Sequence, residues 1–255
     1  MIICPNDPDE ERYSEDSLLG GRLRFLQPVR GYRVAIDPVL LAAAVPVGGG
    51  PEEVLDAGAG TGAAALCLAA RAPAVRVTGL ERQPELLSLA VRNAALNGLD
   101  ERVRFVAGDL LAPPPVLKAR GFDQVMTNPP FHPAGRSSIP QEATRHGAHL
   151  AEVGIGTWLR ACLARLRSGG RLTLVHRADQ LDAILAALAG RAGDVTICPL
   201  WPDAGARAAK RVIVVARKGS RAPMRLARGL VLHEPGGRFT PEADAILREG
   251  CALPL

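Results

Sequence analysis

Aromatic residues and paired cysteines are scarce in this sequence. Phe, Trp and Tyr make up 4% of the 255 residues, whereas hydrophobic residues as a whole make up 47%. The core must therefore be built from Ala, Leu and Val, and the composition argues against a disordered chain. The five cysteines include no C-x-x-C pair, which argues against a zinc site or a disulfide framework and favours a reducing, cytoplasmic environment.

Long apolar runs and a secretion signal are also missing. The most apolar stretch, residues 39–47, has nine residues including Pro46, too few to span a bilayer. Residues 1–16 carry six acidic side chains against one arginine, the reverse of a secretion signal. We therefore expect no membrane partner, and because no three histidines have metal-ligand spacing we expect no metal. The net charge of +5 allows a nucleic-acid partner without requiring one.

A glycine-rich stretch follows the first buried apolar run of the core. Gly58, Gly60 and Gly62 are spaced two apart, a pattern typical of a strand that turns sharply into a helix. The next apolar run ends in Glu81, about twenty residues past the middle glycine, where a nucleotide-binding βαβ unit places the carboxylate that holds a ribose. These residues predict a nucleoside-containing cofactor. They do not separate a nicotinamide dinucleotide from S-adenosylmethionine, and a plain tight turn is the structural alternative.

Strands and helices alternate from residue 54 onward, which predicts an α/β fold with a doubly wound, mostly parallel sheet. The expected strands begin at 54 and then cover 75–81, 103–109, 122–127, 171–175, 195–198 and 211–217. The expected helices cover 84–96, a segment around 159–166 that Gly169-Gly170 ends, and 181–188. Because the carboxyl ends of parallel strands meet at one edge of a sheet, the strand-ending Asp56, Glu81, Asp109 and Asn128 should face one crevice.

The segments around these elements also carry local signals. We expect residues 1–16 to be mobile and residues 20–34 to form a hairpin-like strand pair. Asp37 should cap a short helix. Residues 113–115 are three prolines, which argue against regular structure, and the length of 132–155 indicates a functional flap.

The stretch Asn128-Pro129-Pro130-Phe131 carries the most specific signal. Proline favours an extended Asn128, so that the Asn128 side-chain oxygen and the Pro129 carbonyl can converge on one point. An exocyclic amino group offers two N–H donors there, and accepting both favours a pyramidal nitrogen with its lone pair aimed for reaction. Phe131 can stack on the base, worth ~1–3 kcal/mol. A Pro-Pro turn closed by a core phenylalanine is the structural alternative.

These motifs, in this order, resemble those of class I S-adenosylmethionine-dependent amino-methyltransferases over most of the chain. The resemblance implies a seven-stranded sheet with an antiparallel last strand, and the methionine part of the cofactor over the glycine loop. It also implies that Glu81 accepts from the ribose hydroxyls, that Asp109 contacts the adenine, and that the catalytic residues Asn128, Pro129, Pro130 and Phe131 hold the target amine. The expected cofactor-binding residues are Arg33, Asp37, Asp56, Ala57, Gly58, Gly60, Gly62, Glu81, Arg82, Asp109, Leu110 and Asn128.

Within that group, the lead-in 27–33, the Asn-Pro-Pro-Phe-His stretch and the segment 209–212 resemble the bacterial tRNA1(Val) adenine-N6-methyltransferase family. This resemblance implies methyl transfer to N6 of an adenine beside the anticodon of a tRNA. Phe131 followed by His132 also occurs in guanine-N2 methyltransferases of ribosomal RNA, which is the first alternative. Glutamine-N5 methylation of a release factor, a nicotinamide-dependent dehydrogenase and an RNA-binding module without catalysis are the others.

Basic side chains indicate the partner. Residues 204–233 contain eight basic and no acidic side chains, and such a stripe beside the crevice would hold RNA phosphates. A solvated edge in an arginine-rich protein is the alternative. The expected RNA-binding residues are Arg30, His132, Arg207, Lys210 and Arg211. We expect 1–50 to form an N-terminal extension, 51–225 the cofactor-binding methyltransferase domain, and 226–255 a tail packed on that core.

Overall fold

A mixed sheet organises the fold, and the computed structural model describes the chain over residues 12–31, 33–129 and 144–255, with side chains from residue 154 in the last range. Within these residues the sheet has nine strands in the order β10-β8-β9-β7-β6-β3-β4-β5, and β11 also pairs with β8. Their bounds are β3 Glu52–Ala57, β4 Val75–Glu81, β5 Val103–Ala107, β6 Phe122–Thr127, β7 Leu166–Arg177, β8 Ala192–Asp203, β9 Arg211–Lys218, β10 Arg225–Leu226 and β11 Leu230–His233.

Neighbouring strands of this sheet run parallel except at β9, which is antiparallel to both β7 and β8. The predicted doubly wound, mostly parallel α/β sheet is therefore confirmed. From β3 to β9 the last strand in sequence is the antiparallel one, as expected. The expected count of seven strands is exceeded by β10 and β11, because the chain after β9 turns back along the outer side of β8.

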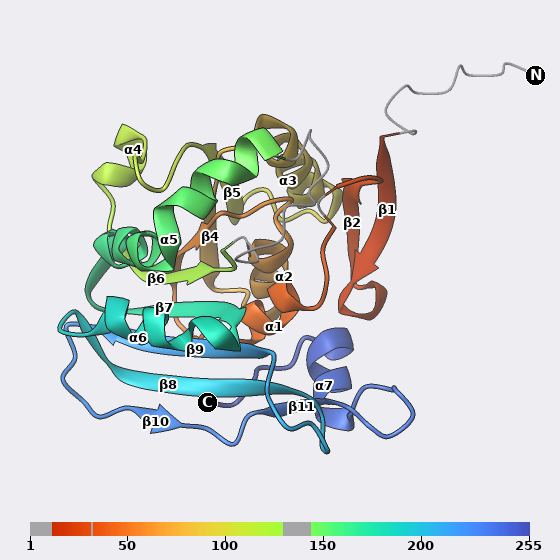
Figure 1. Ribbon diagram of the computed structural model, residues 1–255. Helices are drawn as coiled ribbons and strands as arrows, with labels where there is room; N and C mark the ends of the chain where they lie inside the picture. The colour runs from red at the N-terminus through yellow and green to blue at the C-terminus, as the bar shows by residue number, and fades with distance from the viewer. Residues whose placement is uncertain (1–11, 32, 130–143) are drawn as a thin grey trace, which may run out of the picture.

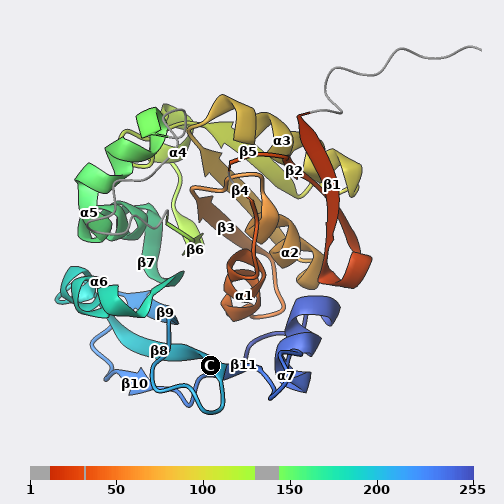
Figure 2. The same cartoon turned by 45° about the vertical axis from the view of Figure 1, so that its right-hand side comes forward.

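Helices cover both faces of this sheet (Figures 1 and 2). One layer consists of α1 Asp37–Ala44, α2 Ala63–Arg71 and α3 Pro84–Leu96, and the other of α4 Pro115–Lys118, α5 Thr144–Arg165 and α6 Leu181–Leu188. Successive strand residues point to opposite faces. Val54 therefore packs with Leu66 of α2, whereas its neighbour Leu55 packs with Leu159 of α5. The Ala-, Leu- and Val-rich sequence thus builds two separate buried clusters.

A two-stranded hairpin, β1 Tyr13–Leu18 and β2 Leu23–Pro28, lies against α3. The amide of Asn93 on α3 accepts from the Leu26 backbone N–H at 2.7 Å and donates to the Leu26 carbonyl at 2.9 Å. Asn97 makes the same pair of bonds to the backbone of Arg24, at 2.9 and 2.8 Å. Of the strand pair expected within residues 20–34, only β2 lies in that range; its partner β1 lies earlier, at Tyr13–Leu18. The expectation that residues 1–16 are mobile is wrong from Tyr13 onward, because β1 pairs with β2.

Two local predictions are corrected by the structure. Residues 144–155 are not a loop, because α5 begins at Thr144; residues 132–143 of the expected flap lie outside the described residues. The pair Gly169-Gly170 does not end a helix, because α5 stops at Arg165 and β7 runs through both glycines. A Cβ on Gly170 would lie 2.8 Å from the Asp123 carbonyl, so glycine there permits close strand pairing.

Two further corrections concern helix starts, and a third concerns the end of a strand. Pro115, the last of the three prolines, is the first residue of α4, because proline lacks only an N–H that a first helical turn leaves unbonded. Asp37 does not cap α1 with its side chain; Ile36 holds the N-cap position, and Asp37 Oδ2 accepts from Arg211 Nε at 3.1 Å. The strand expected at 103–109 ends at Ala107. The division into extension, core and tail stays a prediction.

Candidate active site

The glycine loop joins β3 to α2 in a backbone conformation that favours glycine. Gly58, Gly60 and Gly62 have φ values of 78°, 57° and 89°. A Cβ on Gly62 would lie 2.7 Å from Phe105 Cζ, and one on Gly58 would lie 3.2 Å from the ring of Trp158. Side chains are thus excluded by both torsion and space, and the loop backbone is left bare toward the edge of the sheet.

Glu81 holds this loop in place from the end of β4. Its carboxylate is 6% exposed. Oε2 accepts from the Gly60 N–H at 2.8 Å, and Oε1 accepts from the N–H groups of Arg82 and Gln83 at 2.8 Å each. A carboxylate can accept about four hydrogen bonds, so Glu81 retains acceptor capacity for the hydroxyls of a ribose.

Asp56 is the buried acid of the loop. It is 2% exposed, and its Oδ2 has no hydrogen-bond partner among the described residues. Burial raises the pKa of Asp56 to about 7, opposed by the hydrogen bond from the Ala65 backbone and reinforced by the nearby Glu81 charge. A partnerless buried acceptor is costly, and a bound ligand that donates to it would remove that cost. This fits the α-ammonium group of S-adenosylmethionine.

Asp109 follows β5 at the same edge, because the register pairs Glu81 with Ala107 and the Gly108 N–H donates to the Glu81 carbonyl at 3.0 Å. Asp109 Oδ1 accepts from the Leu111 N–H at 2.9 Å, and its Oδ2 lies 3.9 Å from Arg82 Nη1. Leu110 beside it is buried. The predicted residues Glu81, Arg82, Asp109 and Leu110 are thus brought together.

Asn128 follows β6 on the other side of the glycine loop. The β3–β6 register pairs Asp56 with Met126, so Asn128, two residues further on, lies level with Gly58. Its side-chain oxygen Oδ1 is buried and has no hydrogen-bond partner among the described residues. Pro129 is buried, whereas the predicted Pro130, Phe131 and His132 lie outside the described residues. The expected crevice residues Asp56, Glu81, Asp109 and Asn128 therefore line one edge of the sheet.

Trp158 is a site neighbour that the sequence analysis missed. Its indole Nε1 donates to Thr127 Oγ1 at 3.0 Å, and Thr127 Oγ1 donates to the Ala57 carbonyl at 2.8 Å. This chain of bonds fixes the residue before Asn128 to the residue before Gly58. No spacing or motif marks a tryptophan fourteen residues into α5, and only the packed structure shows its role.

We expect Thr127→Val to lower the free energy of unfolding by about 1–3 kcal/mol, because it leaves the indole N–H and the Ala57 carbonyl unpaired in a buried place. Urea unfolding measures the change, and Thr127→Ser should restore most of it. Thr173→Val is the matched control, since Thr173 is buried on β7 and its Oγ1 has no partner among the described residues. Equal losses at the two positions would contradict the bonding role of Thr127.

The predicted lead-in residues contact other parts of the chain. Arg33 donates to Asp16 Oδ2 at 3.0 Å and to Ser14 Oγ at 3.2 Å, both on β1. Asp37 pairs with Arg211 at the start of β9. Within the part of the chain that the structure describes, neither side chain forms a hydrogen bond with the glycine loop. Their roles in cofactor binding therefore stay predictions.

The basic segment 204–233 divides between the two edges of the sheet. Arg207 and Lys210 are exposed in the β8–β9 connection, and half-buried Arg211 begins β9, all at the edge that carries Asn128. The antiparallel β9 then carries the chain to the opposite edge, where Lys218 ends the strand. The expectation of a stripe wholly beside the crevice is thus wrong. Arg30 is exposed after β2.

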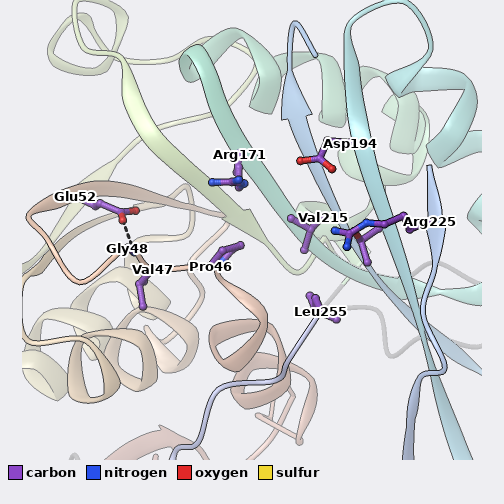
Figure 3. A pocket seen from close by; sticks show the side chains of 10 residues that line it. Pro46, Val47, Gly48, Glu52, Arg171, Asp194, Val215, Arg225 and Leu255 are labelled. Atoms are coloured by element: carbon purple, nitrogen blue, oxygen red, sulfur yellow. Dashed lines mark hydrogen bonds between the residues drawn. The ribbon is translucent and has the colours of Figure 1, made fainter. Parts of the chain in front are cut away.

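A cavity of about 280 Å³ opens at that opposite edge (Figure 3). Arg171 of β7 and Arg225 of β10 reach into it beside Glu52 and Asp194. The two arginines are balanced by the two acids, and Glu52 already accepts from the Gly48 N–H at 2.8 Å. None of the described residues that were predicted for the site lines this cavity.

The described residues lack the side-chain groups of a metal site and the helices of a membrane span. They contain no group of three or more His, Cys, Asp or Glu side chains arranged to hold a metal ion. None of their helices has the length and the apolar character needed to cross a bilayer.

Known proteins are similar to this chain in sequence and in fold. The chain is 30% identical over 216 residues to the tRNA1(Val) (adenine(37)-N6)-methyltransferase of Aeromonas hydrophila, covering 83% of this chain and 84% of that protein. It is 45% identical over 98 residues to the release factor glutamine methyltransferase of Deinococcus radiodurans, but the match spans only 33% of that protein's length. The crystal structure of a predicted O-methyltransferase from Agrobacterium tumefaciens superimposes with a TM-score of 0.70 at 31% identity, covering 85% of this chain and 97% of that one.

The family comparison agrees with the geometry of the site. The model of the methyltransferase small domain matches residues 38–195, from α1 to the start of β8. This range contains the glycine loop, Glu81, Asp109 and Asn128. The cofactor is thus S-adenosylmethionine, and the nicotinamide dehydrogenase considered from the glycine pattern is excluded. The chain belongs to the methyltransferase small domain family and is an S-adenosylmethionine-dependent methyltransferase.

Proposed function

We propose that this enzyme methylates the N6 amino group of an adenine in RNA, and that its substrate is a tRNA modified beside the anticodon. The observation that carries the proposal is the buried Oδ1 of Asn128, which lies level with the glycine loop and has no hydrogen-bond partner among the described residues. A buried acceptor without a partner suits a substrate group whose N–H donates a hydrogen bond to it. The name of the Aeromonas relative supports adenine in tRNA as that substrate.

The residues of this chain would act by positioning. S-adenosylmethionine, when bound, supplies the electrophilic methyl group. Asn128 Oδ1 and the Pro129 carbonyl would accept hydrogen bonds from the two N–H groups of the adenine amine. This arrangement favours a pyramidal nitrogen and turns its lone pair toward the methyl group. The Trp158–Thr127–Ala57 bonds hold this strand end against the glycine loop. Flipping an unpaired loop base into the site costs at most a few kcal/mol.

Two other NH₂ groups could donate hydrogen bonds to the same acceptors. Glutamine-N5 of a release factor is supported by the Deinococcus relative, and guanine-N2 of ribosomal RNA by the Phe131-His132 pair. RNA is favoured over protein because Arg207 and Lys210 extend from the same edge of the sheet without ion-pair partners among the described residues. Arg30, His132 and Arg211 complete the RNA contacts that we propose.

A comparison of three substrates tests the proposal. The protein is incubated with tritiated S-adenosylmethionine and, separately, with total tRNA, ribosomal RNA and release factor, and labelled RNA is digested to nucleosides. We expect label in tRNA that elutes as N6-methyladenosine. Label in N2-methylguanosine or in the release factor would replace the proposal with one of the two alternatives.

Cofactor binding is tested at Glu81. We expect Glu81→Ala to weaken the binding of S-adenosylmethionine by about 1.5–3 kcal/mol in titration calorimetry, the range for hydrogen bonds to a charged group. Loss of the Gly60 contact loosens the loop and adds to the effect. Glu85→Ala, four residues on at the exposed start of α3, is the matched control. Equal affinities of the two variants would contradict the role of Glu81.

A further inference from the structure

The outer border of the sheet carries the chain back toward the active-site edge. β10 and β11 both pair in parallel with β8, with Arg225 opposite Thr196 and His233 opposite Asp203. Figure 1 shows the two strands beside β8 at the border of the molecule. Seven residues of β8 at ~3.3 Å each span ~23 Å. The register runs from Thr196 through Val215 and Thr173 to Met126, so Arg225 lies level with Met126, and the segment from β10 to β11 runs from there past the edge of Asn128.

This border carries a row of exposed arginines, which we call the border row: Arg221, Arg225 and Arg228. Within the described residues none of the three has an ion-pair partner; Arg225 Nη2 donates to the neutral hydroxyl of Thr196 at 3.0 Å. Arg225 of this row lines the cavity of Figure 3. Arg207 and Lys210 stand at the other end, where β8 meets β9.

The border row rests on a fixed backbone. The indole Nε1 of Trp201 on β8 donates to the Arg228 carbonyl at 3.2 Å. Gly229 has a φ of 88°, and a Cβ there would lie 2.7 Å from Trp201 Nε1 and closer still to the Pro199 carbonyl. Glycine thus lets the segment press onto β8. The Ala227 N–H donates to the Ile197 carbonyl at 2.8 Å, so the row is preorganised rather than carried on a loose tail.

Charged side chains on an edge strand also prevent edge-to-edge aggregation. That role is met by charges of either sign, and natural surfaces mix the two. Here thirty consecutive residues, 204–233, contain no acid. A row of one charge sign along this border matches a polyanion that carries one charge per ~1.7 Å of duplex axis.

We propose that the border row binds the phosphate backbone of the substrate RNA at a distance from the target base and leads it toward the edge that carries Asn128. This inference rests on the proposed function, because it takes the partner to be RNA. The stem of a structured RNA would lie along β10 and β11, while its unpaired loop would reach the site past Arg207 and Lys210.

The test is the salt dependence of RNA binding. Arg225→Gln combined with Arg228→Gln is compared with Arg76→Gln combined with Arg104→Gln at the other border of the sheet. Both pairs are exposed, and each has one arginine bonded to a neutral oxygen, Thr196 Oγ1 for Arg225 and the Glu101 carbonyl for Arg76. The probe is fluorescently labelled total tRNA, titrated at several NaCl concentrations.

For the border-row pair we expect the slope of log K against log salt to flatten by ~1.4–1.8, or ~0.7–0.9 for each lost phosphate contact. The control pair should keep the wild-type slope, and both should bind S-adenosylmethionine as the wild type does. A wild-type slope in the border-row pair, equal flattening in both pairs, or no binding of tRNA to the wild type would each overturn the inference.

The methylation assay separates this inference from the proposed function. If tRNA adenine is methylated but the border-row slope is unchanged, the enzyme acts on RNA without the row, and only the inference fails. If the row alters tRNA binding but no adenine is methylated, the RNA surface stands and the proposed reaction fails.

Discussion

Alanine at position 128 should lower the turnover of methyl transfer ~100- to 1000-fold, by comparison with the loss of one preorganised polar group in a dry site. The change removes one of two converging acceptors, so the amine is bound but its lone pair is no longer directed. Cofactor affinity should stay within a few-fold, because the glycine loop, Glu81 and Asp56 are untouched. Single-turnover rates with tRNA and titration of the cofactor measure the two quantities.

Aspartate at the same position is the sharper comparison. A carboxylate accepts hydrogen bonds as well as an amide oxygen does, so Asn128→Asp should retain activity that Asn128→Ala has lost. The proline geometry after residue 128 is the same in both variants. Near-normal turnover of Asn128→Ala on tRNA adenine would contradict the acceptor mechanism and leave residues 128–131 with only the structural role of a turn.

Asparagine at position 56 should raise the free energy of unfolding of the ligand-free protein by about 2–4 kcal/mol at pH 8. The pKa of Asp56 is raised from 3.8 to about 7 because the side chain is buried, and a displacement of about three pKa units corresponds to ~4 kcal/mol. The folded state therefore holds this proton more tightly than the unfolded state. Stability falls as the pH rises from about 4 to about 7, and above that range the cost is complete.

Urea unfolding of wild type and Asp56→Asn at pH 5 and pH 8 measures this effect. We expect a clearly smaller gain at pH 5, where the folded protein still carries the proton. Asp100→Asn makes the same chemical change at an exposed position and should change stability little. Equal stability of wild type and Asp56→Asn at pH 8 would show that the buried carboxylate carries no such cost.

The same variant should bind S-adenosylmethionine ~10- to 100-fold more weakly, because Asp56 Oδ2 would lose its charge toward the ligand's ammonium group. For the wild type, affinity should increase with pH between 6 and 7 as Asp56 ionises. A variant that is more stable and binds less well is the expected trade where a site keeps a strained group for its ligand. Unchanged affinity would remove Asp56 from the cofactor site.

The strand ends of the site could be predicted from sequence because each is local. Gly58, Gly60 and Gly62 specify a turn because glycine readily adopts its backbone torsions. Glu81 follows at the sequence separation that one βαβ unit sets. Parallel pairing then brings these ends to one edge whatever the side chains between them. The fold class and the main site residues could therefore be predicted from patterns of residues that are close together in the sequence.

What could not be predicted depends on contacts between distant parts of the chain. The bonds from Trp158 to Thr127 and on to Ala57 join three elements, and no residue among them is unusual for its position. Asp37 has the sequence of a helix cap, yet it accepts from Arg211, which is 174 residues away. The glycines of β7 have the composition of a helix stop, but they lie within a strand, where the Asp123 carbonyl leaves no room for a Cβ on Gly170.

The placement of β9 has a consequence for synthesis on the ribosome. In the described chain, β8 pairs only with β9, β10 and β11, all of which are translated after it. At ~5–20 residues per second, β8 waits about one to three seconds for the end of β9 to be made, and longer for β10 and β11. During that delay its apolar residues Val195, Ile197 and Leu200 have no strand beside them. The nascent chain is therefore open to mispairing and to chaperone binding in the interval between the emergence of β8 and that of β9.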